Sequence, residues 1–167
     1  MNNNELIAFV KANPVGVLST MGEDGISAAA VYYIVDEDGT MYFNTHQDSA
    51  KLQNFIRDPQ IAFTAFSREP AMTLQVRGDA HVIDDISSIE SLYTELLHRI
   101  FQSDTVPPVL KMGGSRMELV KITPTWMRLG SFSHNQNGAD SYTIIIGNKK
   151  TKIKSRISGF LCISVLL

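Results

Sequence analysis

Two hydroxyls and a lysine lie together where a strand-like pattern gives way to a helical one. The segment is "NTHQDSAK", residues 44–51, with alternating apolar residues before it and helical spacing after it. A lysine in the first turn of a helix faces the positive end of the helix dipole, at a cost of about 0.3 kcal/mol or more unless an anion lies nearby. Free backbone N–H groups of that turn, with Thr45, Ser49 and Lys51, could form a phosphate cradle.

The same residues also permit a simpler interpretation. Asp48 or Ser49 could cap the helix, and Lys51 could lie in solvent with Asp48 as its countercharge. Such sequences are common at helix starts, so the residues alone leave both interpretations open.

A second polar set follows the strictly alternating segment "MTLQVRGDAHVI", residues 72–83. Gln75 and Arg77 are two residues apart and therefore share a face of the expected strand. They could reach the same ligand as the cradle if the strands are neighbours. The alternative is a solvated outer face, on which Arg77 and Asp79 form an ion pair of little value.

Composition limits the class of protein. The 167 residues fit one domain, and 44% hydrophobic with 19% charged residues is a globular composition. A net charge of −2 argues against general nucleic-acid binding, which needs clustered Lys and Arg. The single Cys162 excludes an internal disulfide, and the four histidines lack metal-ligand spacing, so no metal site is expected.

We expect a soluble, cytoplasmic protein rather than a membrane-associated one. The start "MNNNELIAFVKANP" lacks the basic beginning and long apolar core of a signal peptide. No run approaches the roughly 20 apolar residues that span a bilayer. A lone cysteine fits a reducing compartment.

The elements that must position these residues are mostly strands. Glycine-containing turns separate the first three strand-like segments, and a helix over about 48–57, with Leu52, Phe55 and Ile56 inward, follows them. "IAFTAF", residues 61–66, is apolar enough to be buried on both faces. A further helix is expected over about 86–101, capped by Asp85, before a last clear strand over 116–129. About six antiparallel strands with peripheral helices predict a mainly β (α+β) fold, a split β-barrel.

The C-terminal region differs in character from the rest. We expect a domain over residues 1–130 and an extension over 131–167, which comprises a polar loop, the strand-like "YTIIIG", a basic run and an apolar end. The apolar end is too short to span a membrane and suits an added strand or a partner-facing edge. Contact with a membrane surface and a disordered terminus are the alternatives.

In order and spacing, these segments resemble the pyridoxamine 5'-phosphate oxidase-like family of FMN-binding split β-barrels, in particular its general-stress-protein-like members. The resemblance covers about residues 5–129. It rests on "GVLSTMGEDGISAAAVYYIVDEDGTMYFNT", on "SAKLQNFIRDPQIAF" with its Ser-x-Lys and Asp-Pro, on "QVRGDAHVI" and on "LVKITPTWMRL".

This resemblance implies a homodimer that binds FMN in two equivalent clefts between subunits. Thr45, Ser49 and Lys51 would hold the FMN phosphate, and the strand from Ala28 would lie against the isoalloxazine ring. The remaining implied contacts come from that strand, from the flavin-facing strand and from the partner subunit: Ala29, Ala30, Val31, Tyr32, Gln75, Arg77, Trp126 and Arg128. The three alanines 28–30 and the missing C-terminal oxidase signature argue against pyridoxamine phosphate as the substrate.

Three functions follow from the resemblance. The first is an FMN-dependent oxidoreductase acting on a small molecule, in which the cofactor supplies the reactive atoms, so no catalytic residue is assigned. The second is a non-enzymatic carrier of a flavin or of a related cofactor such as deazaflavin or haem. The third is a cofactor-free dimeric barrel.

Overall fold

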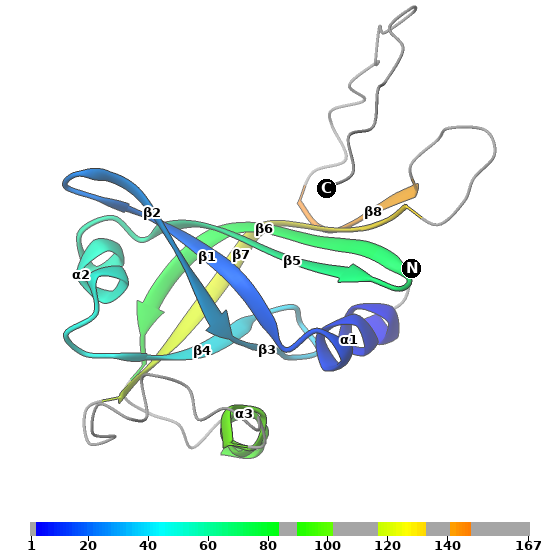
Figure 1. Ribbon diagram of the computed structural model, residues 1–167, viewed down its shortest axis with the longest axis horizontal. Helices are drawn as coiled ribbons and strands as arrows, with labels where there is room; N and C mark the ends of the chain where they lie inside the picture. The colour runs from blue at the N-terminus through cyan, green and yellow to red at the C-terminus, as the bar shows by residue number, and fades with distance from the viewer. Residues whose placement is uncertain (1–2, 84–89, 102–116, 133–140, 148–167) are drawn as a thin grey trace, which may run out of the picture.

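The fold is a curled antiparallel sheet with helices around it, as a computed structural model shows for residues 3–83, 90–101, 117–132 and 141–147 (Figure 1). In chain order the elements are α1 (Asn3–Ala12), β1 (Val15–Gly22), β2 (Gly25–Tyr32), β3 (Ile34–Val35), β4 (Met41–His46), α2 (Ala50–Arg57), β5 (Gln60–Arg68), β6 (Ala71–Val82), α3 (Glu90–Phe101), β7 (Met117–Ser131) and β8 (Ser141–Ile146). The predicted split barrel with peripheral helices is confirmed.

The strand order is β2-β1-β5-β6-β7-β4-β3. The first half of β7, residues 117–122, pairs with β4, and residues 127–131 of β7 pair with β8. Within the described residues there are eight strands, where the sequence indicated about six. The second of the three strand-like segments that glycine-containing turns separate, residues 26–35, is divided at Tyr33, whose N–H donates to the Pro14 carbonyl at 3.1 Å. The strand-like "YTIIIG" supplies β8.

Helices α1 and α2 lie at opposite ends of the barrel (Figure 1). From α2, Leu52 and Phe55 enter the core, as expected, but Ile56 is 69% exposed, so its predicted inward position is wrong. At 100° per residue, Lys51 and Phe55 lie on one side of Leu52 and Ile56 on the other. The buried face of α2 is therefore on the side of Lys51 and Phe55 and not on the side of Ile56.

The expectation that β5 is buried on both faces is also wrong. Ile61, Phe63 and Ala65 are in the core, whereas Phe66 is 63% exposed and Ala62 is exposed too. Val17 and Met21 of β1 are exposed like Phe66 of β5, so among the described residues nothing covers the outer side of these two strands.

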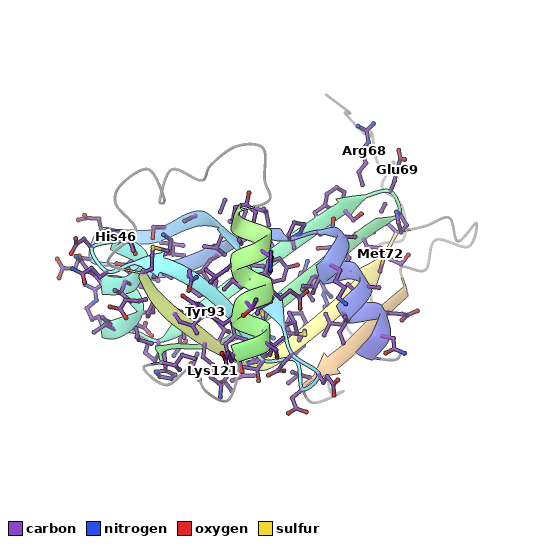
Figure 2. The ribbon with its side chains drawn as sticks, turned by 90° about the horizontal axis from the view of Figure 1, so that it is seen from below. His46, Arg68, Glu69, Met72, Tyr93 and Lys121 are labelled. Carbon is purple, nitrogen blue, oxygen red and sulfur yellow. The ribbon has the colours of Figure 1, made fainter. Side chains whose placement is uncertain are left out.

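Helix α3 covers a different part of the outer face. Leu96 is fully buried against Ile34, Tyr42 and Leu119, and Figure 2 shows the helix lying across the strands there. The expected helix start and its Asp85 cap lie outside the described residues.

The expected C-terminal extension is described only in part. Its strand β8 pairs with β7, whereas residues 133–140 and the basic and apolar segments over 148–167 lie outside the described residues. The division at residue 130 stays a prediction. In the described part of the chain, no helix is long and apolar enough to cross a membrane.

Candidate functional site

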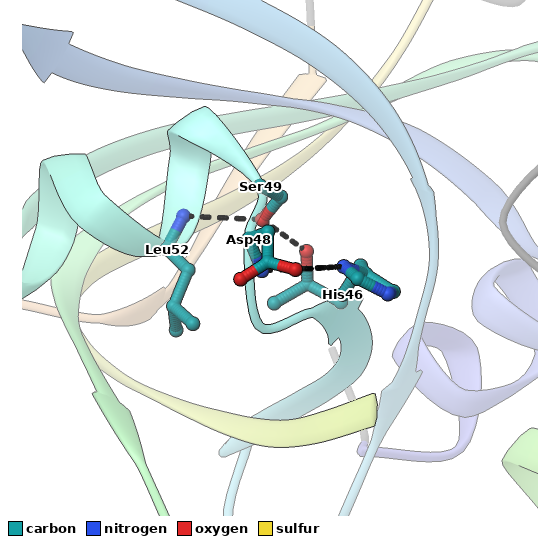
Figure 3. Close-up of polar contacts among 5 residues, drawn as sticks. His46, Asp48, Ser49 and Leu52 are labelled. Atoms are coloured by element: carbon teal, nitrogen blue, oxygen red, sulfur yellow. Dashed lines mark hydrogen bonds and ion pairs between the residues drawn. The ribbon is translucent and has the colours of Figure 1, made fainter. Parts of the chain in front are cut away.

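The end of β4 and the start of α2 bring three predicted residues together. The Thr45 and Ser49 hydroxyl oxygens are 2.8 Å apart, and Lys51 Nζ donates to Thr45 Oγ1 at 3.3 Å. Ser49 is the N-cap of α2, since its Oγ accepts the Leu52 N–H at 3.3 Å (Figure 3). We call Thr45, Ser49 and Lys51 the cradle.

The cradle has more donors than acceptors. If Thr45 donates to Ser49, the Ser49 oxygen accepts two hydrogen bonds and its own O–H proton is available to a ligand. Lys51 has three N–H donors, and only the one bonded to Thr45 is used within the described chain. These donors suit an acceptor with several oxygens.

Lys51 is partly removed from bulk water. It is half-buried, and burial lowers the pKa of its ammonium below the ordinary lysine value. No described carboxylate forms an ion pair with it, including Glu118, the cross-strand partner of Thr45. A desolvated cation without an internal countercharge is stabilised by an external anion.

The turn before α2 bears on both interpretations of this segment. Asp48 lies near His46, with its Oδ2 3.7 Å from His46 Nδ1 and its backbone N–H donating to that nitrogen at 3.2 Å (Figure 3). Asp48 is therefore not the countercharge of Lys51. Ser49 does cap the helix, as the simpler interpretation expected, while also belonging to the cradle.

The strands β6 and β7 bring four other predicted residues together. Gln75 lies opposite Arg128, and Arg77 lies opposite Trp126. Arg128 Nε donates to Gln75 Oε1 at 2.9 Å. The guanidinium carbons of Arg77 and Arg128 lie 4.7 and 5.4 Å from the centre of the Trp126 ring. We call these four residues the outer cluster.

A bulge in β7 makes this arrangement possible. The register of β6 and β7 shifts between Arg77 and Gly78, so Thr125 is an extra residue in β7. Because of this extra residue, the core-facing positions of β7 change from even-numbered residues such as Ile122 to odd-numbered residues such as Met127. Trp126 therefore faces outward. Gly78 is required here because an added Cβ would lie 2.4 Å from the Thr123 carbonyl oxygen.

The outer cluster borders a groove of about 490 Å³ on the open face of the sheet. Cross-strand pairing extends the row from Arg77 through Ala62 and Ser19 to Ala28. It likewise extends the row from Gln75 through Thr64 and Val17 to Ala30. The side chains in these rows are small, so they leave the groove open. These residues occupy every second position of β1 and β5, and that alternation is the sequence signal that could have identified them as outward-facing.

The cradle and the outer cluster lie on opposite faces of the sheet. Thr45 is 1% exposed and shares the core-facing side of β4 with Phe43, whereas Gln75 and Arg77 alternate with core residues of β6 and point outward. Their strands are not neighbours, since β7 lies between β4 and β6. One chain therefore does not bring the two sets to one ligand.

The predicted residues of β2 are divided in the same way. Ala29 and Val31 lie opposite the core-facing Leu18 and Gly16 of β1, and Val31 is buried. Ala30 alternates with them onto the outer face, and so does Tyr32, which packs beside α3.

Asn54 is a positioning residue that sequence reasoning missed. Its Nδ2 donates to Thr20 Oγ1 at 3.0 Å and to Ser27 Oγ at 3.1 Å, and these two hydroxyls are 3.1 Å apart. This cluster ties the helix of the cradle to the hairpin formed by β1 and β2. A partner 34 residues away in sequence leaves no local signal. Within the described residues, no group of three His, Cys, Asp or Glu side chains could hold a metal ion.

Comparison with known proteins identifies relatives by sequence model and by fold. A family model described as pyridoxamine 5'-phosphate oxidase matches residues 3–129. No curated protein matches the sequence.

Several solved structures are similar in fold. General Stress Protein 26 from Bacillus anthracis str. Sterne is 17% identical, with a TM-score of 0.58 over 76% of this chain and 92% of that one. A pyridoxamine 5'-phosphate oxidase-related, FMN binding protein from Nostoc punctiforme PCC 73102 is 14% identical, with a TM-score of 0.53 over 86% and 90%. A structure named F420 Reductase is 22% identical, with a TM-score of 0.53 over 68% and 87%.

Proposed function

This chain belongs to the pyridoxamine 5'-phosphate oxidase family, and we propose that it is an FMN-binding oxidoreductase acting on a small molecule. The cradle would hold the phosphate of FMN. When bound, FMN supplies hydride and electron transfer, so the protein has to bind it, orient it and admit the second substrate.

One observation carries this proposal. Lys51 is a half-buried ammonium without a described carboxylate partner, next to the hydroxyls of Thr45 and Ser49 at the N-terminus of α2. A phosphate dianion would accept from the lysine, from the serine and from free backbone N–H groups of the first turn. The chemistry of these donors fits a phosphate-bearing cofactor.

We also propose that the working unit is a homodimer with its cofactor clefts between subunits. The cradle and the outer cluster lie on opposite faces of one sheet, so a cofactor that meets both sets needs them from two copies. The open outer face carries exposed apolar side chains, among them Val17 at 41%, Met21 at 44% and Ile26 at 75%, which a second copy would cover.

The names of two structural relatives agree with the proposed class of cofactor. One is called an FMN binding protein and another F420 Reductase, so a flavin or a deazaflavin is the class of cofactor to test first. We further propose a cytoplasmic location, which the single cysteine of the sequence supports.

The absorption spectrum of the purified protein tests the function. The oxidoreductase should be yellow, or become so with added FMN, and should be bleached by a reductant such as NAD(P)H. Yellow protein that no reductant bleaches would instead indicate a carrier. Colourless protein that ignores added FMN would contradict flavin binding.

A further inference from the structure

Three side chains of α2 form one polar row along the helix. Lys51, Asn54 and Arg57 are spaced by three residues, so they are neighbours on the helix surface. Lys51 belongs to the cradle, and the other two contact the hairpin formed by β1 and β2. The row therefore connects the cradle to strands that are distant from it in sequence.

Asn54 makes the best-defined contacts of this row. Its amide nitrogen has two N–H donors, which serve Thr20 Oγ1 at 3.0 Å and Ser27 Oγ at 3.1 Å. Thr20 and Ser27 are cross-strand partners, and their hydroxyl oxygens are 3.1 Å apart. An added Cβ on Gly22 would lie 3.2 Å from Asn54 Oδ1, so the backbone at the end of β1 also encloses the amide.

The contacts of Arg57 hold the hairpin less firmly. Its Nη2 donates to the Met21 carbonyl at 3.3 Å, and its Nη1 lies 3.1 Å from Glu23 Oε1. The side chains of Arg57 and Glu23 are 44% and 87% exposed, so solvent screens this ion pair and its contribution is small. Thr20, in contrast, is 3% exposed, so leaving its hydroxyl without a partner would be costly. Among the described contacts, Asn54 is therefore the main polar connection between α2 and the hairpin.

The orientation of α2 depends on such a connection because the helix is short. It has eight residues, of which Leu52 and Phe55 are buried on one side. Two buried side chains on one side leave the rotation of a two-turn helix about its axis weakly determined. The hydrogen bonds of Asn54 fix a second side. Lys51 lies one turn before Asn54, so these bonds also determine where its ammonium meets Thr45.

We propose that Asn54, held by Thr20 and Ser27, positions the first turn of α2 and makes the cradle selective for a phosphorylated ligand over the same ligand without its phosphate. Asn54 acts through the helix, since its described hydrogen bonds go to the hairpin. A phosphate binds well when the lysine, the serine and the backbone donors already converge on it. The positioning of the turn needs no cofactor, whereas the selectivity rests on the proposed function.

Amide hydrogen exchange on the full chain without bound flavin tests the positioning. Mass spectrometry follows exchange in residues 44–52, which contain the start of α2, and in α1 as an internal reference. We expect exchange in 44–52 to be about fivefold faster in Asn54→Ala and in Thr20→Val, the factor for a hydrogen bond of about 1 kcal/mol, with no change in α1. Thr20→Ser, which keeps the hydroxyl, and Gln53→Ala, which removes an exposed neighbour on α2, should exchange like the parent.

The affinities for FMN and for riboflavin test the selectivity. Riboflavin lacks only the phosphate, so the ratio of the two affinities isolates the phosphate contact. We expect this ratio to fall by about fivefold or more in Asn54→Ala and in Thr20→Val and to be retained in Thr20→Ser. A residue with a merely structural role would lower both affinities together. An unchanged ratio in both variants would therefore overturn the selectivity.

The exchange data can overturn the positioning by themselves. Exchange in 44–52 that equals that of the parent in both Asn54→Ala and Thr20→Val would do so, and so would an equal rise in α1, which indicates a general loss of stability. Because the two residues share a hydrogen bond, their effects on exchange should be less than additive in the double variant. A parent that binds FMN no more tightly than riboflavin, with exchange as expected, would contradict the proposed function and support the positioning.

Discussion

The two ends of β4 carry polar clusters of opposite character. At its start, Asp36 accepts from the backbone N–H groups of Asp38 and Thr40, both at 2.9 Å, and from the Tyr42 hydroxyl at 3.2 Å. At its end, Lys51 and Ser49 converge on Thr45 with donors that the described chain does not use. The first cluster makes its hydrogen bonds within the described chain, and the second has donors left over that we propose a ligand uses.

This difference separates a structural role from a proposed binding role. A carboxylate that receives its hydrogen bonds from its own turn stabilises the fold and offers little to a ligand. A half-buried ammonium without a countercharge contributes little to stability and is poised to bind an anion. Substitutions at the two ends should therefore affect different measurements.

The largest effect is expected from Lys51→Ala at the cradle. This substitution should weaken FMN binding by about 1.5–3 kcal/mol, the range for a charge-assisted phosphate contact, while the free energy of unfolding stays unchanged or rises. Flavin fluorescence titration measures the affinity. Lys11→Ala, which removes an exposed lysine of α1, is the control and should leave the affinity unchanged. Unchanged affinity would leave Lys51 as a structural residue.

The opposite result is expected from Asp36→Ala at the start of β4. Losing the acceptor of two backbone N–H groups and of Tyr42 should lower the free energy of unfolding by about 2 kcal/mol. Urea unfolding measures this loss. FMN affinity should be that of the parent protein, and a parallel loss of affinity would show that the two ends are not independent.

Ser49→Ala should affect both measurements, because Ser49 is at once the cap of α2 and a member of the cradle. Removing the cap should lower the free energy of unfolding by about 1 kcal/mol. FMN affinity should fall as well, since one donor is lost. Ser49→Thr keeps a hydroxyl and should restore both. A loss of stability with full FMN affinity would reduce Ser49 to a cap.

The smallest effect is expected from Tyr42→Phe, at about 1 kcal/mol of unfolding free energy. Burial and the neighbouring Asp36 raise the pKa of the Tyr42 hydroxyl from 10.0 to about 12. Its stabilising contribution is therefore complete below pH 10.0 and is lost as the pH rises toward about 12. Urea unfolding across this range should show a steeper fall for the parent than for the variant, and equal slopes would contradict the assignment.

Local patterns predicted much of the fold. Alternation predicted the strand over residues 72–83, in which Leu74, Val76 and Ala80 are in the core, and the helix expected over about 48–57 is α2 (Ala50–Arg57). The cradle was also predictable, because its three residues lie within seven positions and one turn brings them together.

Long-range arrangement was not predictable from these patterns. Gln75 and Arg77 were correctly placed on one face, but which face, and that β7 separates their strand from β4, depends on the order of the whole sheet. The Thr125 bulge and the bonds from Asn54 also join distant segments. The burial of β5 was misjudged because apolar composition does not say whether a helix will cover a face.

The central claim is that the cradle binds the terminal phosphate of a flavin. The most direct measurement compares FMN with riboflavin, which has the same ring and no phosphate, on the parent protein and on Lys51→Ala. We predict that the parent binds FMN more tightly than riboflavin by about 1.5–3 kcal/mol and that most of this preference is lost in the variant. Equal affinity of the parent for the two flavins would contradict the account.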